Sequence, residues 1–348
     1  MYLKSLFLRN FRSYSETLIH FSPKINVIIG KNGQGKTNLL EAIHLLSWGR
    51  SFRTPRLQEL IQKGKTFFYL EAIIEKNGIT ETLKFYYTPE EKKIEHNATV
   101  YPSFTPLLGS IPSVLHTPHD GHLIMGSPEI RRKFFNLHLS QYDPLYLDHW
   151  NRFYKAMKQR NILLKNNDIT TIGCWEEGMA ASFSYLFLKR KEMTLQLQEL
   201  LASMSLPDRL TLTFSPSFPQ KEGYLSHLQK TRAKDLLYAS TLTGPHRDEL
   251  SISINDLSAK SYGSEGQKDF ALFAIKVGEW QRLLQKTNTF PLMGIDDFGV
   301  HLDTIRLKLL QQELQRFSQV FITAPFPILE HHPDALHITL EEGEVSRP

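Results

Sequence analysis

Residues 24–40 carry the sequence KINVIIGKNGQGKTNLL. The first six of these residues are mostly β-branched and predict a short buried strand. Leu39, Ile43 and Leu46 follow at helical spacing and predict an amphipathic helix. Between strand and helix lies a complete G-x-x-x-x-G-K-[ST] pattern, which is typical of phosphate-binding loops. The stretch therefore predicts an α/β fold that binds a nucleotide.

The predicted phosphate loop comprises Gly30, Lys31, Asn32, Gly33, Gln34, Gly35, Lys36 and Thr37. Its glycines allow the backbone to fold into a concave nest whose N–H groups point at phosphate oxygens. We expect Lys36 to reach the β- and γ-phosphates of ATP and Thr37 to offer its hydroxyl to Mg²⁺. A simple glycine turn is the ordinary alternative, and the flanking strand and helix argue against it.

A second segment, residues 291–297 with the sequence PLMGIDD, is an apolar strand that ends in two carboxylates. Asp296 fits the residue that holds Mg²⁺ in such sites, and Asp297 is placed to orient or deprotonate the attacking water. Alone, such a strand end is often only solvated, but together with Lys36 it indicates a catalytic site. Asp296 follows Lys36 by 260 residues, so we expect a large insertion between two halves of one sheet.

Residues 264–268, SEGQK, which we call the signature segment, open a further helical pattern. Ser264, Gly266 and Gln267 would form another anion site from exposed N–H groups and a hydroxyl. One molecule rarely needs two phosphate-binding helix ends for a single γ-phosphate, whereas two molecules that face each other head to tail do. The segment therefore predicts a homodimer that encloses ATP.

The chain has 348 residues and a formal charge of +5 at pH 7, with 41% hydrophobic and 22% charged residues. This composition is that of a globular protein, and the length indicates two domains or one domain with an insertion. No run of about 18 apolar residues is present to span a bilayer, so we expect no membrane partner. Cys174 is the single cysteine and cannot form an internal disulfide, which favours a cytoplasmic location.

Other parts of the chain predict different secondary structure. Residues 67–75 and 79–87 predict a β-hairpin, because Asn77-Gly78 joins two β-rich runs. Residues 97–118 contain four prolines and no charged residue, which predicts an irregular connector and a boundary.

Apolar residues at helical spacing follow over residues 150–164 and 175–204. We accordingly predict an N-terminal part of an ATPase lobe over residues 1–115 and a mainly helical second lobe over residues 116–245. Residues 246–348 would then supply the signature helix and the rest of the ATPase core. No heptad seam is long enough for an extended coiled coil.

Several further strings accompany these motifs. They are LRNFRSY at 8–14, GRSFR at 49–53, GSP at 126–128 followed by Arg131-Arg132, KQRN at 158–161 and GPHRD at 244–248. With them the chain resembles the ABC-type P-loop ATPase heads of the SMC-like class, and within that class the bacterial RecF family of recombination mediators. The resemblance covers essentially the whole chain. The phosphate loop is common to many NTPases, whereas KQRN and GPHRD are specific to the family.

The resemblance implies an ATP-dependent DNA-binding protein of recombinational repair and replication restart. Such proteins dimerise on ATP at single-strand gaps, gap junctions or duplex DNA, and they act with RecO and RecR to help load RecA. The resemblance also implies a weak, DNA-stimulated ATPase in which slow hydrolysis of ATP resets the protein.

Carried over by position, the resemblance adds Asn38 to the ATP-binding residues and places Arg12 near the adenine. Ser264 and Gly266 would contact the γ-phosphate across the dimer. Asp303 would belong to a loop that senses the opposite subunit.

A basic stretch lies in the predicted second lobe, where residues 149–167 contain five bases and no acid. A basic helical face is usually only solvated. Given the resemblance and the neighbouring arginine pair, we expect contact with the DNA backbone rather than with the bases. The predicted DNA-binding residues are Arg131, Arg132, Arg152, Lys155, Lys158 and Arg160.

Two other clusters have ordinary interpretations. His116, His119 and His122 recur at every third residue, but Pro118 and Gly121 interrupt any helix there, so a polar loop is favoured over a metal site. The GPHRD string is either an acid–base cluster or a turn in which arginine and aspartate pair locally, and both interpretations stay open.

Two other functions compete with the ATP-gated DNA-binding protein. A small-molecule kinase would use the same phosphate loop, but the 260-residue separation and the signature segment disfavour it. The ATP-binding subunit of a transporter would need a switch histidine and a surface that docks membrane helices, and the sequence presents neither.

Overall fold

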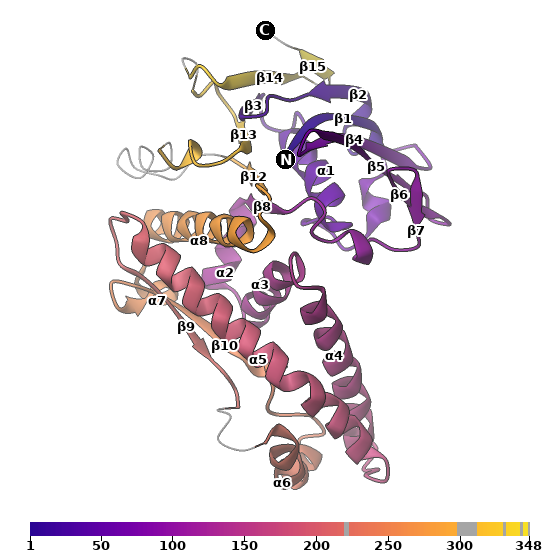
Figure 1. Ribbon diagram of the computed structural model, residues 1–348, viewed down its shortest axis with the longest axis vertical. Helices are drawn as coiled ribbons and strands as arrows, with labels where there is room; N and C mark the ends of the chain where they lie inside the picture. The colour runs from indigo at the N-terminus through magenta and orange to yellow at the C-terminus, as the bar shows by residue number, and fades with distance from the viewer. Residues whose placement is uncertain (219–222, 298–311, 330–331, 342–343, 347–348) are drawn as a thin grey trace. The chain divides into compact units, whose positions relative to one another are not determined.

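The computed structural model describes residues 1–218, 223–297, 312–329, 332–341 and 344–346 (Figure 1). The chain forms two compact units. Unit 1 contains Met1–Asp120 and Glu279–Pro348, and unit 2 contains Gly121–Gly278. Unit 1 is thus built from both ends of the chain. The separation of Lys36 and Asp296 in the sequence predicts this arrangement.

One sheet of unit 1 has the strand order β15-β14-β3-β13-β12-β8. These strands are β3 (Ile25–Ile29), β8 (Ser113–His116), β12 (Leu292–Ile295), β13 (Gln319–Ala324), β14 (Ala335–Glu341) and β15 (Glu344–Ser346). All neighbours pair in parallel except β14 and β15. The carboxyl ends of β3 and β12 therefore meet at the same edge, where the phosphate loop and Asp296 follow.

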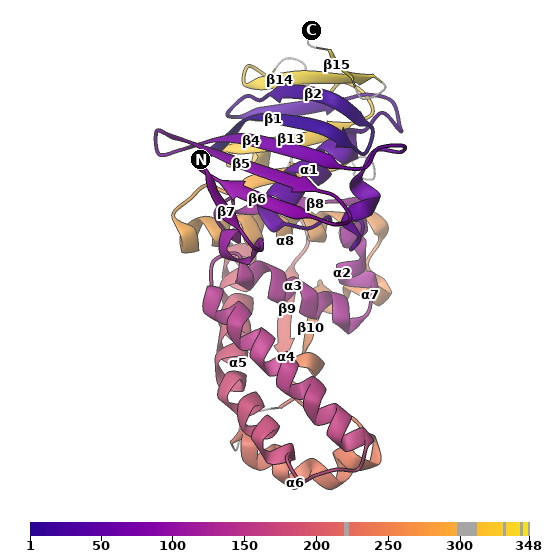
Figure 2. The same ribbon diagram turned by 90° about the vertical axis from the view of Figure 1, so that its right-hand side faces the viewer.

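The other sheet of unit 1 is antiparallel and has the order β2-β1-β4-β5-β6-β7, which Figure 2 shows. Its strands are β1 (Tyr2–Phe11), β2 (Tyr14–His20), β4 (Phe68–Lys76), β5 (Ile79–Tyr87), β6 (Lys92–His96) and β7 (Thr99–Tyr101). The predicted hairpin is confirmed, since β4 and β5 pair across Asn77 and Gly78, both with positive φ. The short helix η1 (Leu57–Leu60) precedes β4, and η2 (Thr105–Leu107) follows β7.

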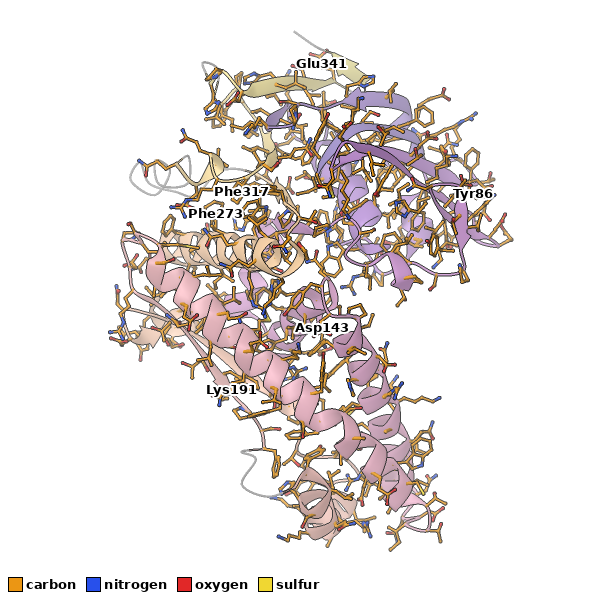
Figure 3. All side chains as sticks on the ribbon, viewed as in Figure 1. Tyr86, Asp143, Lys191, Phe273, Phe317 and Glu341 are labelled. Carbon is orange, nitrogen blue, oxygen red and sulfur yellow. The ribbon has the colours of Figure 1, made fainter. Side chains whose placement is uncertain are left out.

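Helix α1 (Lys36–Trp48) packs between the two sheets of unit 1. Its Leu39 belongs to one buried apolar cluster together with Phe85 of the antiparallel sheet and Phe321 of the parallel sheet. Such a core fixes the first turn of α1, and with it the end of the phosphate loop. Phe317, labelled in Figure 3, packs edge-on against Trp280 with ring centroids 5.0 Å apart.

Unit 2 is mainly helical and contains a small antiparallel sheet of order β11-β10-β9. The short helix η3 (Pro118–Asp120) ends the first segment of unit 1. The helices of unit 2 are α2 (Gly121–Met125), α3 (Pro128–Ser140), α4 (Pro144–Lys165), α5 (Ile172–Ser203), α6 (Tyr224–Leu237), η4 (Pro245–Arg247), α7 (Ala259–Tyr262) and α8 (Glu265–Thr287), which continues into unit 1. Its strands are β9 (Leu210–Ser215), β10 (Glu249–Ile254) and β11 (Leu257–Ser258). No helix in the described ranges combines the length and apolar character needed to cross a membrane.

Helices α4 and α5 are joined by polar contacts at the start of α4. Asp143, which Figure 3 labels, caps α4 by accepting a hydrogen bond from the backbone N–H of Tyr146 (3.0 Å). It accepts another from the Tyr185 hydroxyl in α5 (2.9 Å). Lys189 adds an ion pair to the same carboxylate at 2.9 Å. The bonds from Tyr146, Tyr185 and Lys189 lower the pKa of Asp143 and outweigh its partial burial, which acts in the opposite direction.

The structure differs from the sequence-based expectation in two places. The segment 97–118 is not wholly irregular, because it contains β8, whose partner β12 lies far away in the sequence and whose four residues are too few for a local pattern. The second boundary falls at 278/279 rather than at 245/246. Residues 246–278 stay with unit 2 because β10 pairs with β9 and Gly278 lies against Leu197 of α5.

Candidate nucleotide-binding site

The phosphate loop connects β3 to α1, as the sequence predicts. Two of its glycines have positive φ, with 86° at Gly33 and 99° at Gly35, a conformation that side chains disfavour. A Cβ atom at Gly35 would also lie 2.6 Å from the hydroxyl oxygen of Ser13. The Tyr14 hydroxyl donates to the Gly35 carbonyl at 3.0 Å, so the first strands of unit 1 support the end of the loop.

Lys36 is nearly buried and its ammonium group lies against the loop. It donates hydrogen bonds to the carbonyl oxygens of Gly30 (2.6 Å) and Lys31 (3.1 Å). An ammonium group has three N–H donors, so one is left beyond these two bonds. The geometry suits a lysine that closes the loop on itself and gives its remaining donor to a phosphate oxygen.

Thr37 and Asp296 meet although 259 positions separate them. The Thr37 hydroxyl lies 3.0 Å from each carboxylate oxygen of Asp296. Burial raises the pKa of Asp296, and the charge of Asp297 acts in the same direction, while hydrogen bonds from Thr323 and Thr37 oppose them. Hydroxyl and carboxylate oxygens are the hard donors that Mg²⁺ prefers, and a buried carboxylate is stabilised by a cation, so the two residues fit a Mg²⁺ ion.

Thr323, at the end of β13, joins the two acidic residues. Its hydroxyl donates to an Asp296 carboxylate oxygen at 2.7 Å and accepts the backbone N–H of Asp297 at 2.9 Å. Asp297 has a φ of +55°, an uncommon conformation for a non-glycine residue. The buried threonine therefore holds Asp296 in place and supports the turn that carries the exposed Asp297. Thr323 is not among the residues that the sequence predicts for the site, because only the pairing of β13 with β12 brings it beside the acidic residues.

A second polar cluster lies behind the loop, around the buried carboxylate of Glu41. Arg12 binds both carboxylate oxygens of Glu41, at 2.9 and 2.8 Å, and donates to the Glu59 carbonyl at 2.8 Å. Arg53 reaches the same carboxylate at 3.4 Å, and the Ser51 hydroxyl also donates to it. The cluster thus ties the strings LRNFRSY and GRSFR to α1.

Asn38 belongs to this cluster as well. It accepts a hydrogen bond from Arg53 (2.9 Å) and donates one to the Ser13 hydroxyl (3.0 Å). The Asn38 side chain therefore links the turn between β1 and β2, which contains Ser13, to the segment after α1, which contains Arg53. The bonds of Arg12 to Glu41 and Glu59 fix the orientation of its guanidinium, and a stacked adenine would use the planar face of that group.

The signature segment lies in unit 2, where it forms a capping box at the start of α8. The Ser264 N–H donates to the Gln267 side-chain oxygen (3.0 Å), and the Gln267 N–H donates to the Ser264 hydroxyl oxygen (3.3 Å). The Gln267 side-chain nitrogen donates to Asp208 at 3.0 Å, which fixes the orientation of the amide. The Ser264 hydroxyl donates no hydrogen bond to any residue that the structure describes, so its proton stays available to an anion. Gly266 lies within the first turn, and Asp303 lies outside the described residues.

The predicted DNA-binding residues of α4 do not all face solvent. Lys155 and Lys158 are exposed, and Lys158 lies 4.7 Å from the centre of the Tyr154 ring. The exposed Arg152 forms an ion pair with Asp148 at 2.9 Å. The exposed bases of α4 therefore form a face in which, among the residues that the structure describes, Arg152 alone is paired with an acid.

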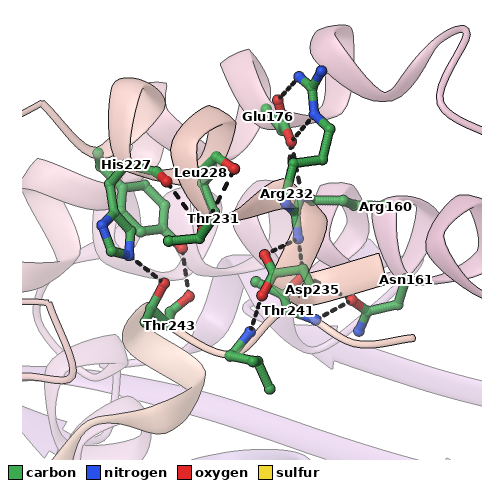
Figure 4. Close-up of polar contacts among 12 residues, drawn as sticks. Arg160, Asn161, Glu176, His227, Leu228, Thr231, Arg232, Asp235, Thr241 and Thr243 are labelled. Atoms are coloured by element: carbon green, nitrogen blue, oxygen red, sulfur yellow. Dashed lines mark hydrogen bonds and ion pairs between the residues drawn. The ribbon is translucent and has the colours of Figure 1, made fainter. Parts of the chain in front are cut away.

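Arg160 is fully buried (Figure 4). It forms ion pairs with Glu176 (3.1 Å) and Asp235 (2.9 Å). The prediction that Arg160 contacts DNA is wrong, because helical spacing places it on the inward face of α4 with Phe153 and Leu164 rather than with the exposed lysines.

The two arginines of α3 are half-buried. Arg131 is paired with Glu249, with 2.6 Å between its Nε atom and a carboxylate oxygen. Arg132 donates one hydrogen bond to the Asp248 carbonyl at 3.1 Å. Arg131 thus has its charge balanced within unit 2, whereas Arg132 forms a single bond with a neutral acceptor. No group of three or more His, Cys, Asp or Glu residues in the described part of the chain is arranged to hold a metal ion, and this includes His116, His119 and His122.

Comparisons with known proteins place this geometry in context. Residues 2–345 match a family model described as the RecF/RecN/SMC N terminal domain. The chain is 40% identical to the DNA replication and repair protein RecF of Protochlamydia amoebophila, over 96% of this chain and 97% of that protein. It is 38% identical to the protein of the same description from Chlamydia abortus, over 93% and 92% of the two chains. A solved structure of the recombination mediator protein RecF-ATP in the RecFOR pathway matches with a TM-score of 0.89 at 29% identity, covering 100% of this chain and 97% of that one.

Proposed function

The chain belongs to the RecF/RecN/SMC family, and within it to the RecF proteins with their ABC-type ATPase head, and from this premise we propose that ATP controls its binding to DNA. The observation that carries the proposal is the meeting of Lys36, Thr37 and Asp296 at one edge of the parallel sheet, from opposite ends of the chain. A structural glycine turn would have no need of a buried carboxylate at that place.

The residues of unit 1 divide the work of ATP hydrolysis. Loop N–H groups and the Lys36 ammonium hold the β- and γ-phosphates. Thr37 and Asp296 would hold Mg²⁺, which neutralises charge on the phosphates when it is bound. Asp297 orients the attacking water and accepts its proton, and Thr323 keeps the Asp297 turn in position.

The signature segment extends this site to a second subunit. In a head-to-tail dimer, the Ser264 hydroxyl would donate to the γ-phosphate held by the partner, while it still accepts the Gln267 N–H. Gly266 and Gln267 would add N–H groups from the positive end of α8. ATP is then enclosed by two copies of the chain, and its slow hydrolysis releases them.

Relatives of this chain are described as DNA replication and repair proteins, and one solved relative as part of a RecFOR pathway. We propose the same setting here, with a dimer on duplex DNA, single-strand gaps or gap junctions that acts with RecO and RecR to help load RecA. The exposed bases of α4 suit contact with the DNA backbone.

The proposed function is tested by following ATP-dependent dimerisation and DNA binding in one preparation, with and without Mg²⁺. Lys36→Met removes the charge that offsets the phosphates, and we expect it to abolish ATP binding, dimerisation and ATP-dependent DNA binding together. DNA should stimulate hydrolysis by the parent protein. Stimulation by a small-molecule acceptor in place of DNA would instead indicate a kinase, and unchanged nucleotide affinity in Lys36→Met would show that the loop is not the site.

A further inference from the structure

The GPHRD string of unit 2 has a structural role at four of its five residues. Gly244 has a φ of +129°, and a Cβ atom there would lie 2.3 Å from the hydroxyl oxygen of Tyr224. The Pro245 carbonyl accepts a hydrogen bond from Arg190, and the Asp248 carboxylate pairs with the same guanidinium at 2.9 Å. These three residues are committed to the interior of unit 2, as is the fourth, His246.

His246 is bound through one ring nitrogen to the Thr241 carbonyl at 2.9 Å. Burial lowers its pKa to about 4; the hydrogen bond to Thr241 opposes this, and the charges of Arg247, Arg132 and Arg190 add to the lowering. The ring is therefore neutral at physiological pH. Two of these arginines also contact the turn directly, since Arg190 donates to the Pro245 carbonyl and Arg132 to the Asp248 carbonyl.

Arg247 is the remaining residue of the string and is exposed. Within the described ranges its side chain has no hydrogen-bond or ion-pair partner. An arginine inside a tightly packed turn, with no contact that the fold requires, is placed to bind something outside the chain.

Arg132 lies beside it. The bond from Arg132 to the Asp248 carbonyl places its guanidinium next to the backbone that follows Arg247. Burial lowers the pKa of Arg132; the charges of Glu249 and Glu129 oppose this, and those of Arg190 and Arg247 add to it. Asp248 forms its ion pair with Arg190 and Glu249 forms its ion pair with Arg131, so neither carboxylate is paired with Arg132 or Arg247.

We propose that Arg132 and Arg247 together bind a phosphate group of the DNA backbone. The inference rests on the proposed DNA binding and names the residues that hold the polymer on unit 2. Guanidinium groups bind phosphate oxygens in pairs of parallel hydrogen bonds. A phosphate would also relieve the repulsion between the two arginines, and the turn holds both in advance.

The test uses the full chain with ATP and a labelled duplex of fixed length, over a series of salt concentrations. Arg247→Ala and Arg132→Gln should each weaken binding about tenfold. Each should also reduce the slope of log affinity against log salt by about one, equally for unrelated DNA sequences. Arg132→Gln keeps a donor for the Asp248 carbonyl, and both variants should retain the parent melting temperature and ATP affinity.

Arg209→Ala is the matched control, because Arg209 is an exposed arginine of unit 2 that already pairs with Asp256 at 3.1 Å. It should leave the salt dependence unchanged. If the parent chain binds DNA and Arg247→Ala has the parent slope, the inference is overturned while the proposed function stands. A variant could instead bind DNA normally but lose ATP affinity, or lose the inhibition of its ATP turnover by inorganic phosphate. Either result would assign the two arginines to a free anion and overturn the DNA assignment. A parent chain that binds no DNA would overturn the proposed function itself.

Discussion

The nucleotide site of unit 1 contains the phosphate loop, and the interior of unit 2 contains the KQRN and GPHRD strings. The residues of these strings differ in whether they remain available to bind a ligand. In unit 1, Lys36 and Thr37 keep hydrogen-bonding capacity for a ligand beyond their contacts with the chain. In unit 2, Arg160 of the KQRN string is fully buried and forms ion pairs with Glu176 and Asp235.

This difference shows that a family-specific string does not by itself reveal whether its residues bind a ligand or stabilise the fold. The generic phosphate loop carries chemistry, whereas KQRN and GPHRD mostly hold unit 2 together and leave only single residues, such as Lys158 and Arg247, on the surface. Burial and partners separate the two cases, because a charged group in the interior must be paired.

The largest expected effect is on catalysis in unit 1. Asp297→Asn removes the carboxylate that we propose accepts a proton from the attacking water, and hydrolysis should fall by about 100-fold or more. ATP binding, dimerisation and the lifetime on DNA should be retained or increased, which turnover and sedimentation assays would show. Hydrolysis at the parent rate would mean that the base lies elsewhere.

The next effect concerns the stability of unit 2. Arg160→Met leaves Glu176 and Asp235 without their central partner and should reduce the free energy of unfolding by about 3–5 kcal/mol. Lys158→Met, two positions away in the same string, should leave denaturant unfolding almost unchanged because its side chain is exposed. Equal unfolding curves for the two variants would erase the distinction between the regions.

Thr323 tests whether unit 1 also depends on a structural residue. Thr323→Val keeps the shape but removes the hydroxyl that joins Asp296 to the Asp297 turn, so turnover should fall about tenfold with little change in ATP affinity. Thr323→Ser keeps the hydroxyl and should recover most of the rate. Equal turnover in Thr323→Val and the parent would show that the bridge does not position the acidic pair.

The smallest effect is expected from the exposed face of α4. Lys155→Glu with Lys158→Glu should weaken binding to every DNA sequence and reduce the salt slope by about two, since each lost phosphate contact retains one counterion. Loss confined to one sequence would contradict backbone recognition. Normal binding at every salt concentration would reduce this face to solvated bases.

The sequence predicts the elements whose pattern is local. The strand–loop–helix at residues 24–40 and the Asn77-Gly78 hairpin are present because each is specified by a few adjacent residues. Strand β8 is missed because its pairing comes from β12, and no pattern of four residues carries that information.

The site residues were also predictable only where a local pattern identifies them. Thr37 and Asp296 are predicted as partners because their chemistry is recognisable apart. Arg160 is misassigned and Thr323 overlooked because the direction of an arginine and the neighbour of a strand end are set by tertiary packing. Arg247 becomes noticeable only after the other residues of its string are seen to be committed.

Sedimentation velocity in ATP and Mg²⁺ tests most directly the claim that two chains enclose the nucleotide head to tail. The parent chain should dimerise. Ser264→Arg should bind ATP yet stay monomeric, because the larger side chain occupies the N-terminal end of α8. Mixing Ser264→Arg with Lys36→Met should restore some dimer, since one composite site then has an intact loop and an intact signature segment. Normal dimerisation of Ser264→Arg alone would contradict the head-to-tail arrangement.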